Sequence, residues 1–175
     1  MSKSKLFPVV LSAMFLALAL VLPFLTAQNH ELGNALCLIH IPVLLCGFFC
    51  GEKYAPLVGF IAPLLRFLLF GMPQLVPGGI SMCFELATYG LVSALLYKYL
   101  PKKKIYIYVS LIAAMLSGRV VWGIARAVFY GLGKSEFGIS AFITGGFVTA
   151  IPGIILQIVL IPILVMTLKR SRGKD

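Results

Sequence analysis

The chain has 175 residues, of which 61% are hydrophobic and only 11% charged, and its mean hydropathy is +1.04. A water-soluble domain has roughly 25% charged residues, so this composition excludes an ordinary soluble fold. The formal net charge of +10 would suit nucleic-acid binding, but the basic residues form short clusters between long apolar runs. We therefore expect no nucleic-acid partner and an integral protein of the lipid bilayer.

Six apolar segments, each long enough to cross about 30 Å of hydrocarbon as a helix, follow one another along the chain. They cover residues 6–27, 34–51, 55–71, 79–100, 105–131 and 139–168. Backbone polar groups in lipid must be hydrogen-bonded within the segment, which favours helices. We predict an all-α, polytopic membrane protein in which residues 1–175 form a single transmembrane domain, a six-helix bundle.

The basic clusters predict the orientation of the chain. If the amino terminus is cytoplasmic, the outer side carries only Lys134, and all the other clustered basic residues are inside. These are Lys3, Lys5, Lys53, Lys98, Lys102, Lys103, Lys104, Lys169, Arg170, Arg172 and Lys174. This asymmetry follows the positive-inside rule, so both termini are expected in the cytoplasm.

Ionisable side chains inside membrane spans are costly, so each of them is a candidate functional residue. With this orientation, His40 is in the outer half of the second span and Arg66 in the outer third of the third. Glu85 is about two turns below the outer surface. Arg119 is central in the fifth span, and Arg126 is nearer its outer end. These groups converge on one outward-facing region.

The fifth span has the clearest pattern. Arg119, Trp122, Arg126 and Tyr130 follow steps of three or four residues and therefore share one helical face. Two guanidinium groups with an indole between them can hold an anionic or planar ligand through paired hydrogen bonds and stacking.

Glu85 has two possible roles. It shares a face with Tyr89 on the fourth span, and both are candidate ligand-binding residues. Alternatively, Glu85 neutralises Arg66 or Arg119 and only stabilises the bundle. Even so, at least one arginine would have no carboxylate partner, and a bound anion or a wet cavity would explain it. The predicted ligand-binding set is His40, Arg66, Glu85, Tyr89, Arg119, Trp122, Arg126 and Tyr130.

Other chemistry is not expected. Cys37, His40 and Glu85 lack the spacing of a metal site, and no nucleophile, histidine and acid form a catalytic set. The Gly133-Lys134-Ser135 stretch resembles the end of a phosphate-binding loop but has Val128 in place of the first glycine. We predict no metal, no bound cofactor and no enzymatic activity.

Four stretches resemble the substrate-binding S-components of energy-coupling factor (ECF) transporters. They are the Ala13-Met-Phe-Leu-Ala17 motif and residues 40–51, 59–66 and 84–90. The last three look like the vitamin-type members of the family. The cobalt and nickel members have a metal-binding histidine near the amino terminus, which this chain lacks.

The resemblance implies a mechanism in a bacterial cell membrane. Such a chain would bind a scarce micronutrient outside and dock through Ala13 and Ala17 onto a transmembrane coupling (T) protein. Two cytoplasmic ATPases, which use the ATP, would drive release inside. Family ligands include riboflavin, thiamine and its pyrimidine precursor, biotin, folate, pantothenate, niacin, pyridoxine and queuosine precursors. Three arginines against one glutamate favour an anionic ligand, and the aromatic residues favour a planar ring.

Two other functions stay open at this point. One is a self-sufficient secondary transporter, which would be expected to have ionisable groups on both sides of a midplane site and often inverted repeats. The other is a structural subunit of a larger membrane complex.

Overall fold

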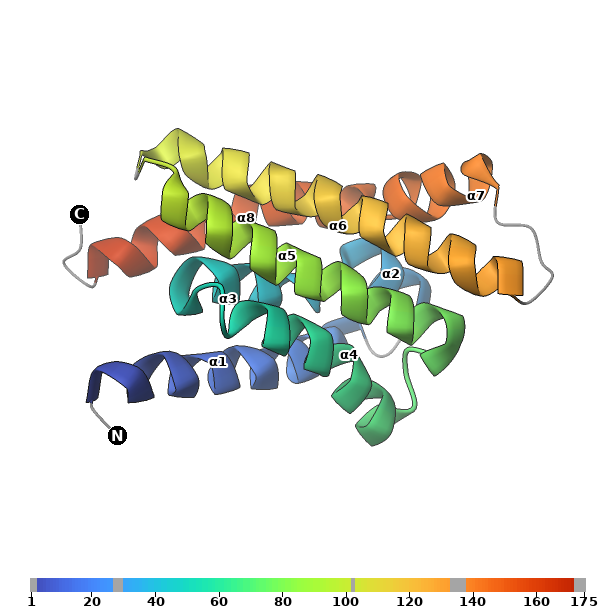
Figure 1. Ribbon diagram of the computed structural model, residues 1–175, viewed down its shortest axis with the longest axis horizontal. Coiled ribbons are helices and arrows are strands. Elements are labelled where there is room, and N and C mark those ends of the chain that lie inside the picture. Colours follow the sequence, from blue (N-terminus) through green and yellow to red (C-terminus); the bar gives the residue numbers. More distant parts are fainter. Residues whose placement is uncertain (1–2, 27–29, 102, 133–137, 172–175) are drawn as a thin grey trace.

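The structure, a computed structural model, describes residues 3–26, 30–101, 103–132 and 138–171, and these form helices without any strand (Figure 1). Three short irregular helical turns, η1, η2 and η3, interrupt the α-helices. In chain order the elements are α1 Lys3–Val21, η1 Leu22–Thr26, α2 His30–Leu36, α3 His40–Cys50, α4 Ala55–Phe70, η2 Leu75–Gly79, α5 Ile80–Tyr99, α6 Lys104–Leu132, α7 Ile139–Ile143, η3 Thr144–Val148 and α8 Ile151–Ser171.

Four helical stretches are long and apolar enough to cross a membrane. They are Leu6–Thr26, Leu75–Tyr99, Lys104–Gly131 and Ile151–Arg170. Helices α3 and α4 are apolar but shorter. With 11 residues, α3 is only about 16 Å long at 1.5 Å per residue. The six crossings and the cytoplasmic termini therefore stay predictions.

The segment 34–51, which we expected as one helix, is divided into α2 and α3. The chain turns at Cys37, whose φ of 48° is in the left-handed region. Pro42 then lies in the first turn of α3, where its missing N–H leaves no helical carbonyl unpaired. Continuous hydrophobicity concealed this break, although the proline position is typical of a helix start.

The segment 139–168 is divided for a similar reason. The π-helical turn η3 contains Gly145 and Gly146, and α8 begins only at Ile151, with Pro152 in its first turn. An ideal Cβ on Gly153 would lie 2.7 Å from the carbonyl oxygen of Leu36. Glycine at this position therefore lets the start of α8 approach the end of α2 directly.

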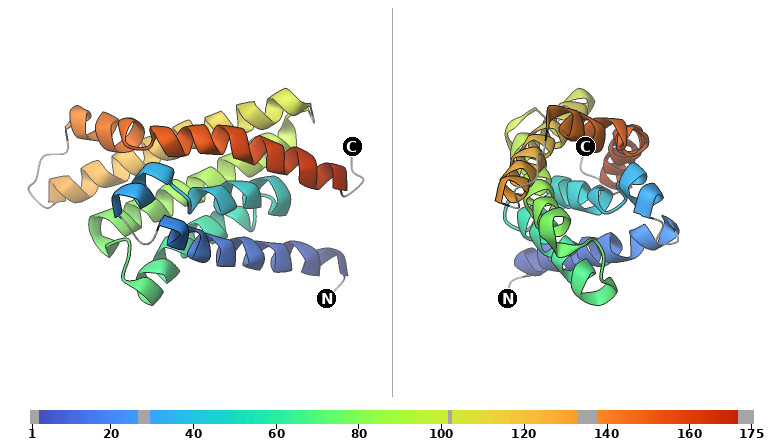
Figure 2. Two further views of the ribbon diagram at one scale, coloured as in Figure 1. Left: turned by 180° about the vertical axis from the view of Figure 1, so that it is seen from behind. Right: turned by 90° about the vertical axis from the view of Figure 1, so that its right-hand side faces the viewer.

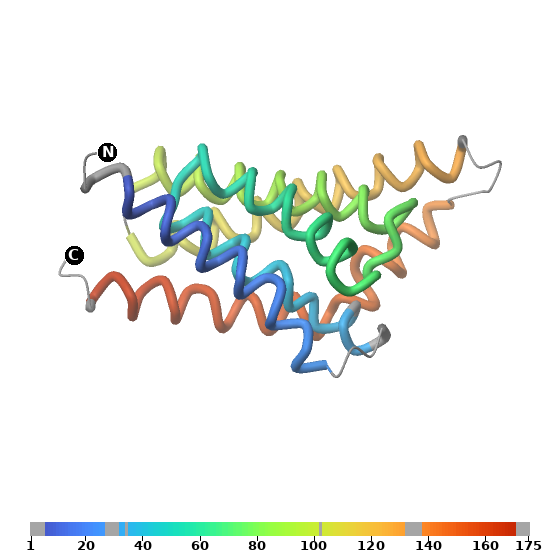
Figure 3. The backbone as a smooth tube through the Cα atoms, turned by 90° about the horizontal axis from the view of Figure 1, so that it is seen from below, coloured from blue at the N-terminus to red at the C-terminus, as the bar shows by residue number. Residues whose placement is uncertain are grey.

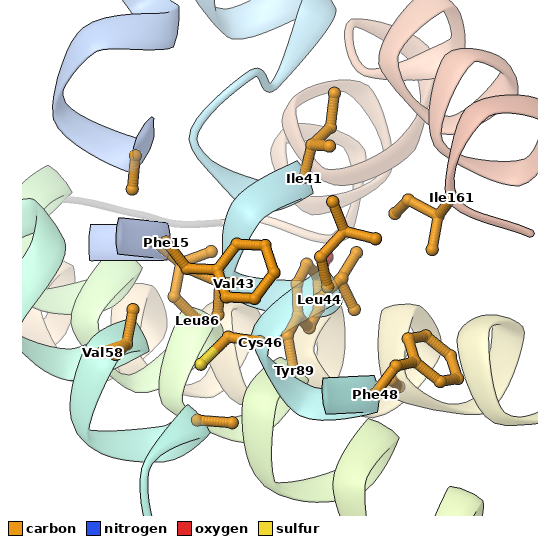
Figure 4. Close-up of a cluster of buried hydrophobic side chains, with 14 of the residues drawn as sticks. Phe15, Ile41, Val43, Leu44, Cys46, Phe48, Val58, Leu86, Tyr89 and Ile161 are labelled. Carbon is orange, nitrogen blue, oxygen red and sulfur yellow. The ribbon is translucent and has the colours of Figure 1, made fainter. Parts of the chain in front are cut away.

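Helix α3 is the centre of the core. All of its residues except Phe49 are buried, and it packs against α1, α4, α5 and α8. Figure 4 shows Val43, Leu44 and Phe48 of α3 among side chains of the surrounding helices. Helix α1 lies on one side of this core against α3 and α4 (Figure 3). The shortest helix of the core is thus the one most enclosed by protein.

The start of α1, the end of α8 and the α5–α6 connection lie at the same end of the bundle (Figures 1 and 2). At this end Lys98 of α5 forms an ion pair with Glu52, and the ammonium of Lys169 lies 3.8 Å from the centroid of the Tyr97 ring. Three of the basic residues predicted to be cytoplasmic lie outside the described residues, namely Lys102, Arg172 and Lys174. Lys134, which is predicted to be external, also lies outside them.

This arrangement gives a direct test of the predicted orientation. Single cysteines at positions 103, 134 and 174, on a cysteine-free background, should react with an impermeant maleimide from one side only. We expect position 134 to react from outside intact cells, and positions 103 and 174 only after the membrane is opened. External labelling at position 174 would contradict the six-span orientation.

Candidate ligand-binding cavity

A cavity of about 420 Å³ lies at the opposite end of the bundle from the start of α1 and the end of α8. This volume is within the usual range for small-molecule sites. The right-hand view of Figure 2 is from this end, where α2, α7, the end of α6 and η2 lie. Seven of the eight predicted ligand-binding residues line the cavity: His40, Arg66, Glu85, Arg119, Trp122, Arg126 and Tyr130.

Glu85 is the centre of a buried polar cluster. Its Oε1 lies 3.0 Å from Nη1 of Arg119 and accepts a 3.0 Å hydrogen bond from the hydroxyl of Tyr89. Nε2 of His40 lies 3.4 Å from the same oxygen, outside hydrogen-bonding geometry. Glu85 and Tyr89 are each 1% exposed. Tyr89, the eighth predicted residue, therefore does not line the cavity but donates a hydrogen bond to Glu85, which does.

Cys37 joins the cluster through both its backbone and its side chain. Its carbonyl oxygen lies 3.1 Å from Nδ1 of His40 and accepts a hydrogen bond of 3.5 Å from Nε2 of Gln157. Nη2 of Arg119 also lies 3.5 Å from the Cys37 sulfur. The break between α2 and α3 thus exposes a carbonyl that orients His40. Sequence reasoning missed Cys37 and Gln157 here, because the break itself was not predicted.

Arg66 enters the cavity from α4 and binds the end of α1. Its Nη1 donates a 3.1 Å hydrogen bond to the carbonyl oxygen of Leu20, and its guanidinium carbon lies 5.9 Å from the centroids of both Phe24 and Phe70. No carboxylate of the described residues pairs with it.

Arg126 has a different environment. Its guanidinium carbon lies 4.9 Å from the centroid of the Trp122 ring on the preceding turn of α6. Its Nε is buried and has no hydrogen-bond partner among the described residues. Nη2 would lie 3.8 Å from a Cβ on Gly78, so η2 passes close to this guanidinium.

Trp122 is largely covered by protein. It is 6% exposed, tilts against Phe142 with 6.3 Å between ring centroids, and would lie 3.2 Å from a Cβ on Gly145. Its contribution to the cavity is therefore an apolar wall next to Arg126. Several lining residues were not singled out from the sequence because they are apolar or small, namely Pro23, Thr26, Gly33, Leu38, Ile39, Met72, Pro73, Met82, Ala141, Gly145 and Thr149.

The two alanines predicted to dock a partner lie on the face of α1 that points away from the core. Ala13 and Ala17 are exposed, while Phe15 and Ala19 on the opposite face are buried against the core. Residues next to the alanines, such as Met14 at 49% exposure, extend an apolar surface along α1. This surface is separate from the cavity.

A comparison with known protein families matched residues 8–165 to the family described as the ECF transporter, substrate-specific component. The chain belongs to this family. Comparisons with curated proteins and with solved structures gave no match. The match extends from α1 to the last part of α8, so it includes every element that lines the cavity.

Membership explains the main features of the chain. An S-component is a multi-pass membrane protein, in agreement with the four long apolar helical stretches. Its family is a transporter's substrate-binding component and not an enzyme family. In general, S-components associate with a T protein and ATPases.

Proposed function

We propose that this S-component captures a water-soluble vitamin or cofactor precursor in the cavity described above, from the outside of a bacterial cell. It then delivers the ligand with a T protein and two cytoplasmic ATPases. The observation that carries the proposal is the convergence of three arginines, a glutamate and a histidine on one cavity at one end of the bundle. Charged groups are costly within a membrane protein unless a partner or a ligand compensates them.

Uptake measurements test whether this chain alone binds the ligand while transport needs the T protein and the ATPases. Proteoliposomes with this chain alone should bind ligand but should not accumulate it. Proteoliposomes that also contain the T protein and the two ATPases should accumulate it when ATP is enclosed. Robust accumulation by this chain alone, without ATP, would instead indicate a self-sufficient transporter and would reject the proposal.

If α1 docks onto the T protein, a substitution on its exposed face should impair uptake without changing ligand affinity. Replacing both Ala13 and Ala17 by leucine adds bulk on an exposed helix face where close approach of a partner helix needs small residues. We expect uptake by the complete transporter to be lost, whereas the Kd of the isolated chain stays the same because the cavity is elsewhere.

The matched control is Ala127→Leu, which makes the same kind of substitution once, at an exposed alanine of α6. This variant should keep both uptake and binding. Loss of ligand binding in the Ala13/Ala17 variant, or equal loss of uptake in the control, would count against docking through this face.

A further inference from the structure

The three arginines of the cavity have three different environments, and only one of them is left for a ligand. We propose, resting on the proposed function above, that the ligand has a carboxylate and that this carboxylate binds Arg126 next to Trp122 and beneath η2. Arg119 and Arg66 are then positioning residues, and the cavity selects acids over their uncharged analogues.

Arg119 is already neutralised. It is 6% exposed and lies 3.0 Å from the carboxylate of Glu85, which also accepts the Tyr89 hydroxyl. Its second nitrogen is near the Cys37 sulfur. A ligand acid on Arg119 would have to compete with a carboxylate that Arg119 and the Tyr89 hydroxyl already hold, so this pair is a poor anion receptor.

Arg66 is also engaged. One of its nitrogens donates to the Leu20 carbonyl, and two phenylalanine rings lie against the guanidinium. A carbonyl oxygen and aromatic faces are environments that stabilise a cation without an acid. Its contacts join α4 to the end of α1, which is a structural task independent of a ligand.

Arg126 has one aromatic face and a buried Nε without a partner among the described residues. A buried donor without an acceptor is unfavourable, and a carboxylate can accept from Nε and a terminal nitrogen together. Among the three cavity arginines, Arg126 is the one with a buried nitrogen that lacks a hydrogen-bond partner among the described residues. Since Glu85 is used by Arg119, the described residues leave the negative charge beside Arg126 to be supplied by the ligand.

The first experiment compares acids with uncharged analogues of nearly the same shape. Nicotinate with nicotinamide, pantothenate with pantothenol, and biotin with biotinamide form such pairs, and folate and riboflavin complete the panel. Binding to the purified full chain, without ATP, is measured by calorimetry or ligand-induced stabilisation. We expect an acid to bind, and its neutral analogue to bind at least about tenfold more weakly, as for loss of a charged hydrogen bond.

The second experiment locates the charge recognition. In Arg126→Gln, the affinity ratio between the acid and its neutral analogue should fall towards one, because the neutral analogue has little to lose. In Arg66→Gln the ratio should persist, even where both affinities change. Arg126→Lys should restore only part of the ratio, because an ammonium lacks the planar fork.

The unfolding temperature of the ligand-free protein separates the two roles of Arg126. A structural role predicts that losing Arg126 lowers this temperature, and a ligand-binding role predicts that it does not. Without ligand, Arg126→Gln removes a charge that has no carboxylate partner among the described residues, so this variant should unfold at the same temperature as the wild type or higher. Arg119→Gln should unfold at a lower temperature. If Arg126→Gln lowers the unfolding temperature and keeps the acid preference, Arg126 belongs to the scaffold and the proposal is wrong.

Different results would overturn the carboxylate assignment and the proposed function. A neutral compound that binds as tightly as every acid would overturn the carboxylate assignment and leave the proposed function intact. Absence of saturable binding by all compounds would count against both.

Discussion

Replacing Glu85 by alanine is expected to lower the free energy of unfolding of the empty protein by about 3–5 kcal/mol, the usual cost of breaking a buried ion pair. The substitution leaves the guanidinium of Arg119 buried without a carboxylate, and it removes the acceptor of the Tyr89 hydroxyl. The measurement is reversible unfolding of the purified chain in mixed detergent micelles, followed by circular dichroism.

Two controls make this result specific. The double variant Glu85→Ala with Arg119→Leu removes both charges, so it should be more stable than Glu85→Ala alone. Glu52→Ala also breaks an ion pair, between Glu52 and Lys98, but these two side chains are 31% and 50% exposed. We expect no measurable loss of stability there. Strictly additive effects of the two substitutions would show that Glu85 and Arg119 do not act as a pair.

Gly59→Ala is expected to destabilise the protein by about 1–3 kcal/mol or more, as for overpacking of a well-filled core. A Cβ on Gly59 of α4 would lie 2.3 Å from the carbonyl oxygen of Leu86 on α5. One turn away, a Cβ on Gly90 of α5 would lie 2.6 Å from the carbonyl oxygen of Ala55 on α4. Because backbone atoms block both positions, the two helices would have to move apart.

Gly131→Ala is the matched control. Gly131 is exposed near the end of α6, and a Cβ there would have no neighbour within 4 Å. Alanine is the better helix former by up to about 1 kcal/mol, so this variant should be as stable as the wild type or more stable. A similar loss in both variants would exclude close packing of α4 and α5 as the cause.

Much of the cavity could be predicted because charge is rare in this chain. Charged residues within apolar runs are costly in lipid, so these groups were expected to converge on one region. The cavity brings together Arg66, Glu85, Arg119 and Arg126. Helical spacing likewise placed Arg119 and Arg126 on one face of α6. These inferences used only periodicity and the high cost of charge in lipid.

The partners of these charges could not be predicted. The sequence left Glu85 free to pair with Arg66 or Arg119, and the choice depends on how α4, α5 and α6 approach one another, which the structure shows as a Glu85–Arg119 pair. The break at Cys37 was missed because apolar residues continue through it, so hydrophobicity alone gives one long helix. The Cys37 carbonyl becomes available to His40 and Gln157 only through that break.

The central claim is that this chain alone binds a small molecule in the cavity. The most direct test is ligand-induced thermal stabilisation of the purified wild-type chain against a vitamin panel, without ATP or partner proteins, together with Met82→Trp, which fills the cavity from α5. We predict saturable stabilisation of the wild type by one compound and its loss in Met82→Trp, with both proteins folded. Equal stabilisation of the two proteins, or none of the wild type by any compound, would contradict the account.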